Sequence, residues 1–143
     1  MHFVTGGAFN GKRKWVKHTY PKQLDWRSMY VDESKITSWE KASSECSIVV
    51  LEGVEQYIKK RWIDQEQVFS REQWRKFIDT WLNWEKEGER SVIWIGTDMM
   101  KGIVPIDPNE RKWRDYTGWA FQELAHYCDR VSLIWYGIEQ RLK

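Results

Sequence analysis

Short, continuous apolar runs recur along the chain and predict buried strands. The clearest cover 3–5, 47–51, 91–95 and 131–136, and each is rich in β-branched residues. Continuous runs, in contrast to alternating ones, are typical of parallel strands whose two faces are both covered by helices. A further strand is predicted around 23–29.

Helical periodicity fills the segments between these strands. It predicts helices over 12–17, over 54–62, from Ser70 to about Gly88, and over roughly 108–127. The third begins with a capping box, Ser70-Arg71-Glu72-Gln73. Its apolar stripe repeats at spacings of three and four through Trp74, Phe77, Ile78, Trp81 and Leu82. The alternation of strands and helices predicts an α/β sandwich with a mainly parallel sheet.

The segment 30–45 does not fit either period cleanly. It carries several hydroxyl side chains around one tryptophan, namely Ser34, Thr37, Ser38, Ser43 and Ser44 around Trp39. We interpret it as a loop or a short helix.

A glycine-rich loop joins the first strand to the first helix. It has the form Gly-x-x-x-x-Gly-Lys, and its predicted nucleotide-binding residues are Gly6, Gly7, Ala8, Asn10, Gly11, Lys12 and Arg13. Glycines let successive backbone N–H groups converge on phosphate oxygens, and the lysine reaches the terminal phosphates. The residue after Lys12 is normally Ser or Thr, whose hydroxyl helps to hold Mg²⁺, but here it is Arg13. The loop therefore favours nucleotide binding over phosphoryl transfer, with plain turn residues after an edge strand as the alternative.

The length and net charge of the chain indicate the number of domains and limit the kinds of partner. The 143 residues predict one domain spanning 1–143, and 23 basic against 21 acidic residues give a net charge of +2. That balance indicates neither a nucleic-acid nor a membrane partner. No apolar stretch approaches the roughly 18 residues of a transmembrane helix. Cys46 and Cys128 lie far apart and predict reduced thiols, so a cytoplasmic protein is expected.

Eleven tryptophans are spread through the chain. Several stand beside basic residues, as in Lys14-Trp15 and Arg61-Trp62, and such pairs can bind single-stranded nucleic acid by stacking. Acidic residues are almost as frequent as basic ones, which favours tryptophans of the core and of subunit contacts. Nucleic-acid binding remains as an outside alternative.

The second half of the chain carries a family resemblance. Its matching residues are Gly102-Ile103-Val104-Pro105, Arg114-Asp115-x-x-Gly118, Gln122, Leu124-Ala125 and the tail Gly137-Ile138-x-x-Arg141-Leu142-Lys143. In this order they resemble the cobinamide kinase/cobinamide-phosphate guanylyltransferase family of cobalamin biosynthesis. The opening Thr5-Gly6-Gly7-Ala8 with Gly11-Lys12, and the strand that ends in Glu52, also resemble that family. The likeness is loose from about Tyr20 to Cys46, where this chain is shorter.

The resemblance implies a RecA-like P-loop NTPase sandwich that forms a homo-oligomer. In that family the loop binds ATP or GTP for phosphorylation of adenosylcobinamide, a corrinoid. A histidine is then guanylylated, so that one difficult transfer is split into two.

Roles follow for individual residues if nucleotide binds. Lys12 is predicted to neutralise phosphate charge, and Glu52, at the end of a central strand, is predicted to hold Mg²⁺ directly or through water. Both are candidate catalytic residues. The resemblance makes Asp98, Arg114 and Asp115 candidate substrate-binding residues. The alternative for Glu52 is a solvent-facing residue after a strand.

Two departures from the family pattern bear on activity. Arg13 replaces the metal-binding hydroxyl, and none of His2, His18 and His126 lies where the family has its histidine. The guanylyltransferase half is therefore expected to be missing. One hypothesis is a kinase that phosphorylates a corrinoid or similar hydroxyl with ATP or GTP. The other is a degenerate relative that binds nucleotide or a partner without chemistry.

Overall fold

Strands and helices alternate along the chain in the computed structural model, which describes residues 1–31 and 36–143. The elements are β1 (His2–Thr5), α1 (Lys12–Thr19), β2 (Leu24–Ser28), α2 (Ile36–Glu40), β3 (Ile48–Glu52), α3 (Val54–Ile58), the π-helical segment η2 (Lys59–Ile63), α4 (Arg71–Lys86), β4 (Ser91–Ile95), α5 (Pro108–Tyr127), β5 (Arg130–Trp135) and β6 (Ile138–Arg141). Within 30–45, residues 36–40 form the short helix α2, whereas Ser34 lies outside the described residues.

The described strands form one sheet in the order β2-β3-β4-β1-β5-β6. Neighbours from β2 to β5 run parallel, and β6 pairs antiparallel with β5. Phe3 in β1 lies opposite Trp94 of β4 on one side and Val131 of β5 on the other. The prediction of an α/β sandwich with a mainly parallel sheet is confirmed. In such a sheet the carboxyl ends of all parallel strands meet at one edge, where ligands bind.

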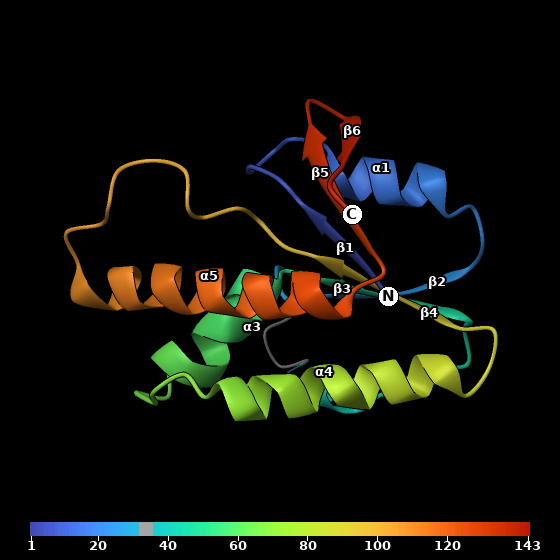
Figure 1. Cartoon of the computed structure of the whole chain (residues 1–143), viewed down its shortest axis with the longest axis horizontal. Coiled ribbons are helices and arrows are strands. Elements are labelled where there is room, and N and C mark those ends of the chain that lie inside the picture. The colour runs from blue at the N-terminus through green and yellow to red at the C-terminus, as the bar shows by residue number, and fades with distance from the viewer. Residues whose placement is uncertain (32–35) are drawn as a thin grey trace.

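Helices cover both faces of the sheet (Figure 1). Alternate side chains of each strand point to opposite faces, so Val4, Val50 and Ile93 pack with Val16 of α1 on one side. The intervening Phe3 and Trp94 join the larger cluster under α3, α4 and α5 on the other side. This two-sided burial explains why the strands appear in the sequence as continuous apolar runs.

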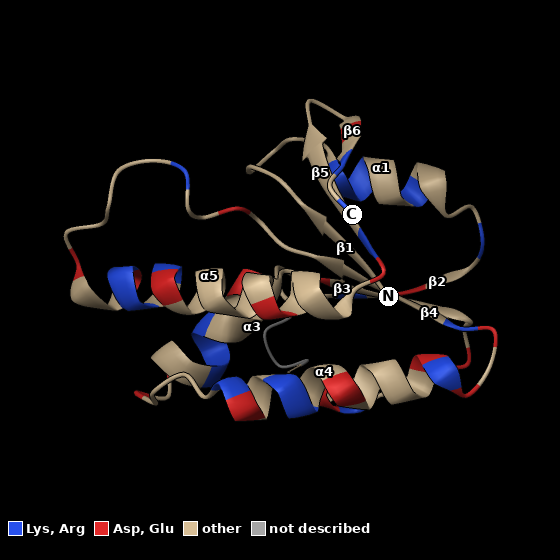
Figure 2. Ribbon diagram, in the orientation of Figure 1, with Lys and Arg blue, Asp and Glu red and all other residues tan. Residues whose placement is uncertain are grey.

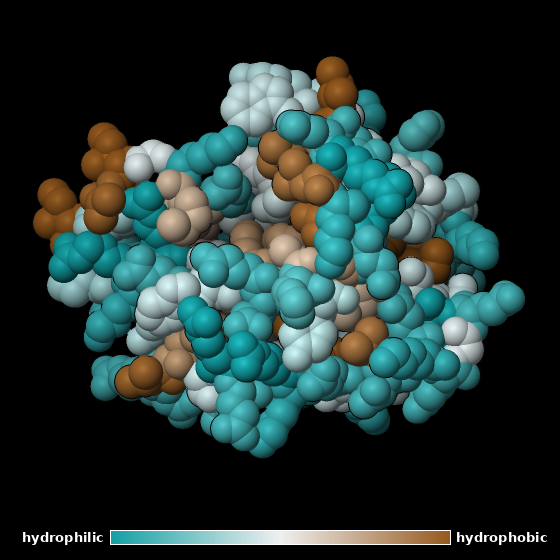
Figure 3. Space-filling view, in the orientation of Figure 1, coloured by the Kyte–Doolittle hydropathy of each residue, from teal (hydrophilic) through white to brown (hydrophobic). Residues whose placement is uncertain are grey.

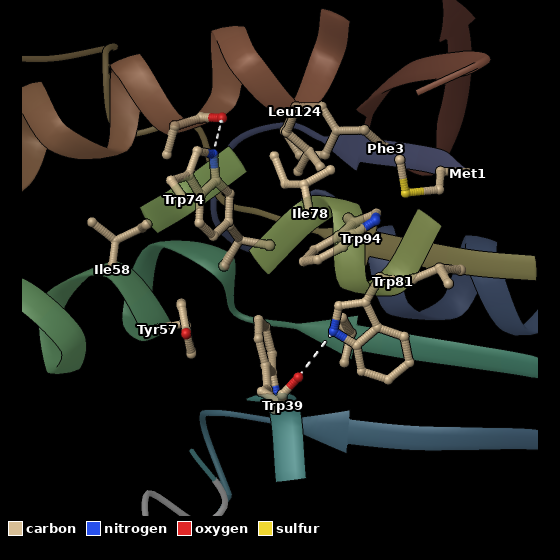
Figure 4. Packing of buried hydrophobic residues seen from close by; sticks show 14 of the residues in the cluster. Met1, Phe3, Trp39, Tyr57, Ile58, Trp74, Ile78, Trp81, Trp94 and Leu124 are labelled. Atoms are coloured by element: carbon tan, nitrogen blue, oxygen red, sulfur yellow. Dashed lines mark hydrogen bonds between the residues drawn. The ribbon is translucent and has the colours of Figure 1, made fainter. Parts of the chain in front are cut away.

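Tryptophans fill the larger cluster (Figure 4). The indole N–H of Trp74 donates to the carbonyl of Ala120 at 3.0 Å, and that of Trp81 donates to the carbonyl of Trp39 at 2.9 Å. Trp39 also stacks on Tyr57 with ring centroids 5.2 Å apart. These aromatic side chains fix the helices against the sheet, which agrees with the prediction that the tryptophans belong largely to the core.

Helix ends follow the sequence signals closely. The Ser70 hydroxyl accepts a hydrogen bond from the backbone N–H of Gln73 at 3.2 Å, and Asp107 caps α5 by accepting from the N–H groups of Asn109 and Glu110. The predicted helix over 54–62 instead changes at Lys59 into η2. Charged side chains are spread over the helices, with basic residues on α1 beside the glycine loop (Figure 2). Among the described residues, no helix has the length and apolar character needed to span a bilayer.

Candidate nucleotide site

A cavity of about 910 Å³ lies at the carboxyl edge of the sheet. The loop after β1, the ends of β3 and β4, and the start of α3 all contribute to its wall, together with Trp113 of α5. The lining residues are Ala8, Phe9, Asn10, Gly11, Lys12, Arg13, Lys14, Lys17, Tyr30, Glu52, Glu55, Gln56, Ile95, Thr97, Met99 and Trp113. The cavity therefore brings the predicted loop, except for Gly6 and Gly7, together with Glu52.

The glycine loop depends on two backbone conformations that favour glycine. Gly6 has a φ of 145°, and a Cβ at this position would lie 2.3 Å from the carbonyl oxygen of Ile134. Gly11 has a φ of 86° and precedes the first residue of α1. The first glycine lets the loop pass close to β5, and the second turns the chain into the helix, so that the N-terminus of α1 points toward the cavity.

The side chain of Lys12 folds back onto the glycine loop. Its Nζ donates to the carbonyl of Gly6 at 3.0 Å and to that of Gly7 at 2.8 Å. Burial lowers the pKa of Lys12, although Glu55, Glu52 and Asp98 act in the opposite direction. The ammonium group is thus held between a neutral loop and acidic residues, where a phosphate oxygen can replace the two carbonyls.

Asn10 anchors the loop to the hairpin formed by β5 and β6. The backbone N–H of Gly137 donates to the Asn10 carbonyl at 2.8 Å, and that of Tyr136 donates to its Oδ1 at 3.3 Å. Next to it, Phe9 has a φ of 59°, a left-handed conformation unusual for a bulky residue, and its side chain is fully exposed. The hydrogen bonds of Asn10 to the β5–β6 hairpin therefore hold the glycine loop in this conformation.

Arg13 forms a two-point ion pair with Glu52. Its Nε donates to Oε1 of Glu52 at 2.9 Å, and its terminal nitrogen donates to Oε2, which also accepts from the indole N–H of Trp26 at 2.9 Å. Burial would raise the pKa of Glu52, but hydrogen bonds from Arg13, Trp26 and Ser28 outweigh it and hold this pKa below its usual range. Glu52 is therefore ionised and neutralised by Arg13.

The residues at this position do not fit a magnesium ion. Both oxygens of Glu52 are occupied by Arg13 and Trp26, and position 13 presents a guanidinium in place of a hydroxyl ligand. Among residues 1–31 and 36–143, no group of three His, Cys, Asp or Glu side chains is gathered around a common point. Mg²⁺ requires oxygen ligands at short distance, and a fixed cation there repels it.

A second carboxylate, Glu55, also faces the cavity and was missed in the sequence. It lies at the second residue of α3 and is buried, and it accepts hydrogen bonds from the Tyr30 hydroxyl and from the backbone N–H of Thr97, the latter at 2.9 Å. Burial raises the pKa of Glu55. Its position in the first turn of a helix that begins directly after a strand end was the available signal.

Of the three candidate substrate-binding residues, Asp98 lies in the loop between β4 and α5, and Arg114 and Asp115 lie on α5. Asp98 accepts from the backbone N–H of Met100 at 2.9 Å, and its own N–H donates to the carbonyl of Gly6 at 3.0 Å. Arg114 donates to the carbonyl of Met100 at 2.7 Å, and Asp115 is exposed. Asp98 therefore adjoins the glycine loop, whereas Arg114 and Asp115 are not part of the cavity wall.

All three histidines fall within the described residues, and none lines the cavity. His2 is buried in β1, where one ring nitrogen lies 2.6 Å from the Tyr20 hydroxyl and the other lies 2.8 Å from that of Ser132. Burial lowers the pKa of His2 to about 4. His18 is exposed on α1, and His126 lies in the last turn of α5.

Comparison with known proteins gives one family match. A family model described as cobinamide kinase / cobinamide phosphate guanyltransferase matches residues 12–142. The match begins at Lys12, so the glycines of the loop precede it. No curated protein matches the chain.

Proposed function

The chain belongs to the cobinamide kinase / cobinamide phosphate guanyltransferase family, and we propose that it binds ATP or GTP and phosphorylates a corrinoid hydroxyl. The family has a P-loop NTPase fold and nucleotide-dependent transferase activity. The kinase half of that activity is the part proposed for this chain.

The observation that carries the proposal is the position of Lys12. Its ammonium group lies inside a glycine loop, at the N-terminus of α1 and at the wall of a cavity of about 910 Å³. Backbone N–H groups of 7–12, the helix N-terminus and Lys12 together favour the β- and γ-phosphates. The remaining wall, which includes Tyr30, Met99 and Trp113, offers apolar surface to a base or to an acceptor.

Arg13 supplies positive charge where a metal ion would otherwise sit. Its guanidinium is about half exposed and lines the cavity beside Lys12, so it can face a phosphate while staying paired with Glu52. Guanidinium groups bind phosphate oxygens through two parallel N–H donors. We therefore propose that nucleotide binds without Mg²⁺, with Glu52 positioning Arg13.

The guanylyltransferase half is proposed to be missing, because no histidine of the described chain lines the cavity. Incubation with α-labelled GTP should leave no acid-labile nucleotide on the protein. Stoichiometric labelling that disappears in His18→Ala would contradict this part of the proposal.

A catalytically degenerate relative that binds nucleotide or a partner is the second candidate. The Arg13–Glu52 ion pair favours it, since it occupies the carboxylate that would hold a metal ion. Binding of nucleotide without any transfer would support this candidate over the kinase.

Self-association is also proposed, as the family resemblance implies. The loop between β4 and α5 exposes Ile103 and Ile106 at 98% and 94%, and brown side chains mark the loop at the left of Figure 3. Apolar side chains gathered on one exposed loop are typical of protein contacts. Light scattering during size-exclusion chromatography should give a mass above that of one chain, and replacing both isoleucines with serine should lower it.

The kinase proposal is tested by transfer of label from γ-labelled ATP or GTP to adenosylcobinamide, with and without Mg²⁺. Labelled adenosylcobinamide phosphate is expected with wild type and not with Lys12→Ala. Nucleotide binding without labelled product would reject the kinase in favour of the second candidate. Failure to bind either nucleotide would reject both.

A further inference from the structure

Glu55 is better placed than Glu52 to act on a bound nucleotide and its acceptor. Its side chain is buried at 2% exposure, and among the acidic residues that influence Lys12 it has the strongest effect. Both oxygens of Glu52 are turned to Arg13 and Trp26, whereas Glu55 makes no ion pair among the described residues. The two carboxylates therefore have different neighbours and different roles.

Three elements orient Glu55. The backbone N–H of Thr97, after β4, donates to Oε2 at 2.9 Å, and the Tyr30 hydroxyl, after β2, donates to Oε1. From α5, the indole N–H of Trp113 donates to the backbone carbonyl of Glu55 at 2.6 Å. The carboxylate is thus held in one fixed orientation at the cavity wall.

Tyr30 is the more exposed partner of this hydrogen-bonded pair. The residue lines the cavity and is 50% exposed, and its hydroxyl lies 3.2 Å from the hydroxyl of Thr97. Its ring passes over Gly53, where a Cβ would lie 3.4 Å from Cε2 of the ring. The absence of a side chain at Gly53 therefore leaves room for the Tyr30 ring. The phenol oxygen can accept a hydrogen bond from a bound acceptor while its own proton is donated to Glu55.

We propose that Tyr30 and Glu55 form a proton relay that activates the acceptor hydroxyl in phosphoryl transfer. This inference rests on the proposed kinase function. The acceptor oxygen forms a bond to the γ-phosphorus, and the bond from that phosphorus to the bridging oxygen breaks, releasing nucleoside diphosphate. The acceptor proton moves to the Tyr30 oxygen while the phenol proton moves to Oε1 of Glu55, which releases it to solvent after the transfer.

The surroundings suit this direction of proton movement. Burial raises the pKa of Glu55, which makes it a stronger base than an exposed carboxylate. Burial and the neighbouring Glu55 raise the pKa of Tyr30, so the phenol passes a proton on and does not remain ionised. The charged groups that face the pair are Lys12 and Arg13 from α1 and Glu52 from β3, and α5 presents the uncharged indole of Trp113.

The test compares Tyr30→Phe with Tyr57→Phe in the transfer of phosphate from ATP to adenosylcobinamide. Both variants lose one hydroxyl, but Tyr57 lies in the core cluster away from the cavity. We expect kcat to fall about 100-fold in Tyr30→Phe, as for loss of a general base, with nucleotide affinity unchanged. Tyr57→Phe should keep the wild-type kcat.

The pH dependence of kcat distinguishes a proton relay from a purely structural role of Tyr30 and Glu55. Wild-type kcat should rise with pH as Glu55 ionises. This rising limb of the pH profile should be absent in Glu55→Gln, whose amide does not titrate. Tyr30→Phe with wild-type kcat, or a lower kcat that keeps the wild-type pH limb, would overturn the relay and leave the kinase intact. A wild type that binds nucleotide and transfers no phosphate would overturn the kinase and the relay together.

Discussion

Replacing Arg13 with serine tests whether the Arg13–Glu52 ion pair stands in for a metal ion. The variant restores the hydroxyl that is usual at this position of a phosphate loop and removes the guanidinium that occupies Glu52. Glu52 is 7% exposed and Arg13 is 48% exposed, so the pair is only half removed from water.

The free energy of unfolding that is lost in Arg13→Ser depends on this partial exposure. Breaking a fully buried pair costs about 3–5 kcal/mol, whereas a fully exposed pair is worth about 0–1 kcal/mol. Trp26 and Ser28 still donate to Glu52 in the variant, so we expect a loss of about 2 kcal/mol. In a domain of 143 residues that corresponds to a melting temperature lower by about 7 °C.

Loss of the Arg13 charge also weakens nucleotide binding. A unit charge about 6 Å from a phosphate contributes about 3 kcal/mol at an effective dielectric constant of about 20. Solvent screening of the half-exposed guanidinium reduces this to about 1.5 kcal/mol, or roughly tenfold in affinity. Arg13→Ser should therefore bind ATP in EDTA about tenfold more weakly than wild type. Added Mg²⁺ should restore its affinity, because the introduced serine hydroxyl and Glu52 then offer oxygen ligands.

Calorimetric titration with ATP, in EDTA and in Mg²⁺, measures both effects. Arg75→Ser is the matched control, because Arg75 also donates from two nitrogens to one carboxylate, Glu123, and is 49% exposed, but lies outside the cavity. Its ATP affinity should equal that of wild type. ATP binding by wild type only with Mg²⁺, or binding by Arg13→Ser in EDTA as tight as that of wild type, would show that Arg13 does not take the place of the metal ion.

Two further predictions concern stability. His2 has a pKa of about 4 when folded against 6.5 when unfolded, so the unfolded chain takes up a proton first as pH falls. The melting temperature should fall between pH 6.5 and pH 4, and His2→Gln should reduce that slope. Trp74 donates to the Ala120 carbonyl, whereas the indole N–H of Trp94 has no hydrogen-bond partner among the described residues. Urea unfolding should therefore show that Trp74→Phe costs about 1 kcal/mol more than Trp94→Phe, and equal costs would contradict this.

Most of the fold could be predicted from local patterns. Buried strands such as 47–51 and 91–95 appear as continuous apolar runs because helices cover both faces, and α5 begins after its capping Asp107. The edge strand β6 was not predicted as a separate element, because Ile138–Arg141 has little apolar character and pairs only with β5. The change from α3 to η2 at Lys59 also has no sequence signal that we can identify.

The sequence could predict the glycine loop from one segment and Glu52 from its place at the end of a central strand, but not the contacts between distant side chains. The glycine spacing identified the loop and Lys12, since the loop is built from one segment. The partners of Arg13 and Glu55 could not be found in this way. Arg13 meets Glu52, 39 residues away, and Tyr30 meets Glu55 only because the strand order places the ends of β2, β3 and β4 side by side.

The most direct test of the nucleotide site is calorimetric titration of wild type and Lys12→Ala with ATP and with GTP, each in EDTA and in Mg²⁺. Lys76→Ala, which removes an exposed lysine of α4, controls for the loss of one positive charge. We expect saturable binding of at least one nucleotide below millimolar concentration in wild type and Lys76→Ala, and none in Lys12→Ala. Absence of binding in wild type, or binding that survives unchanged in Lys12→Ala, would contradict a phosphate site at this loop.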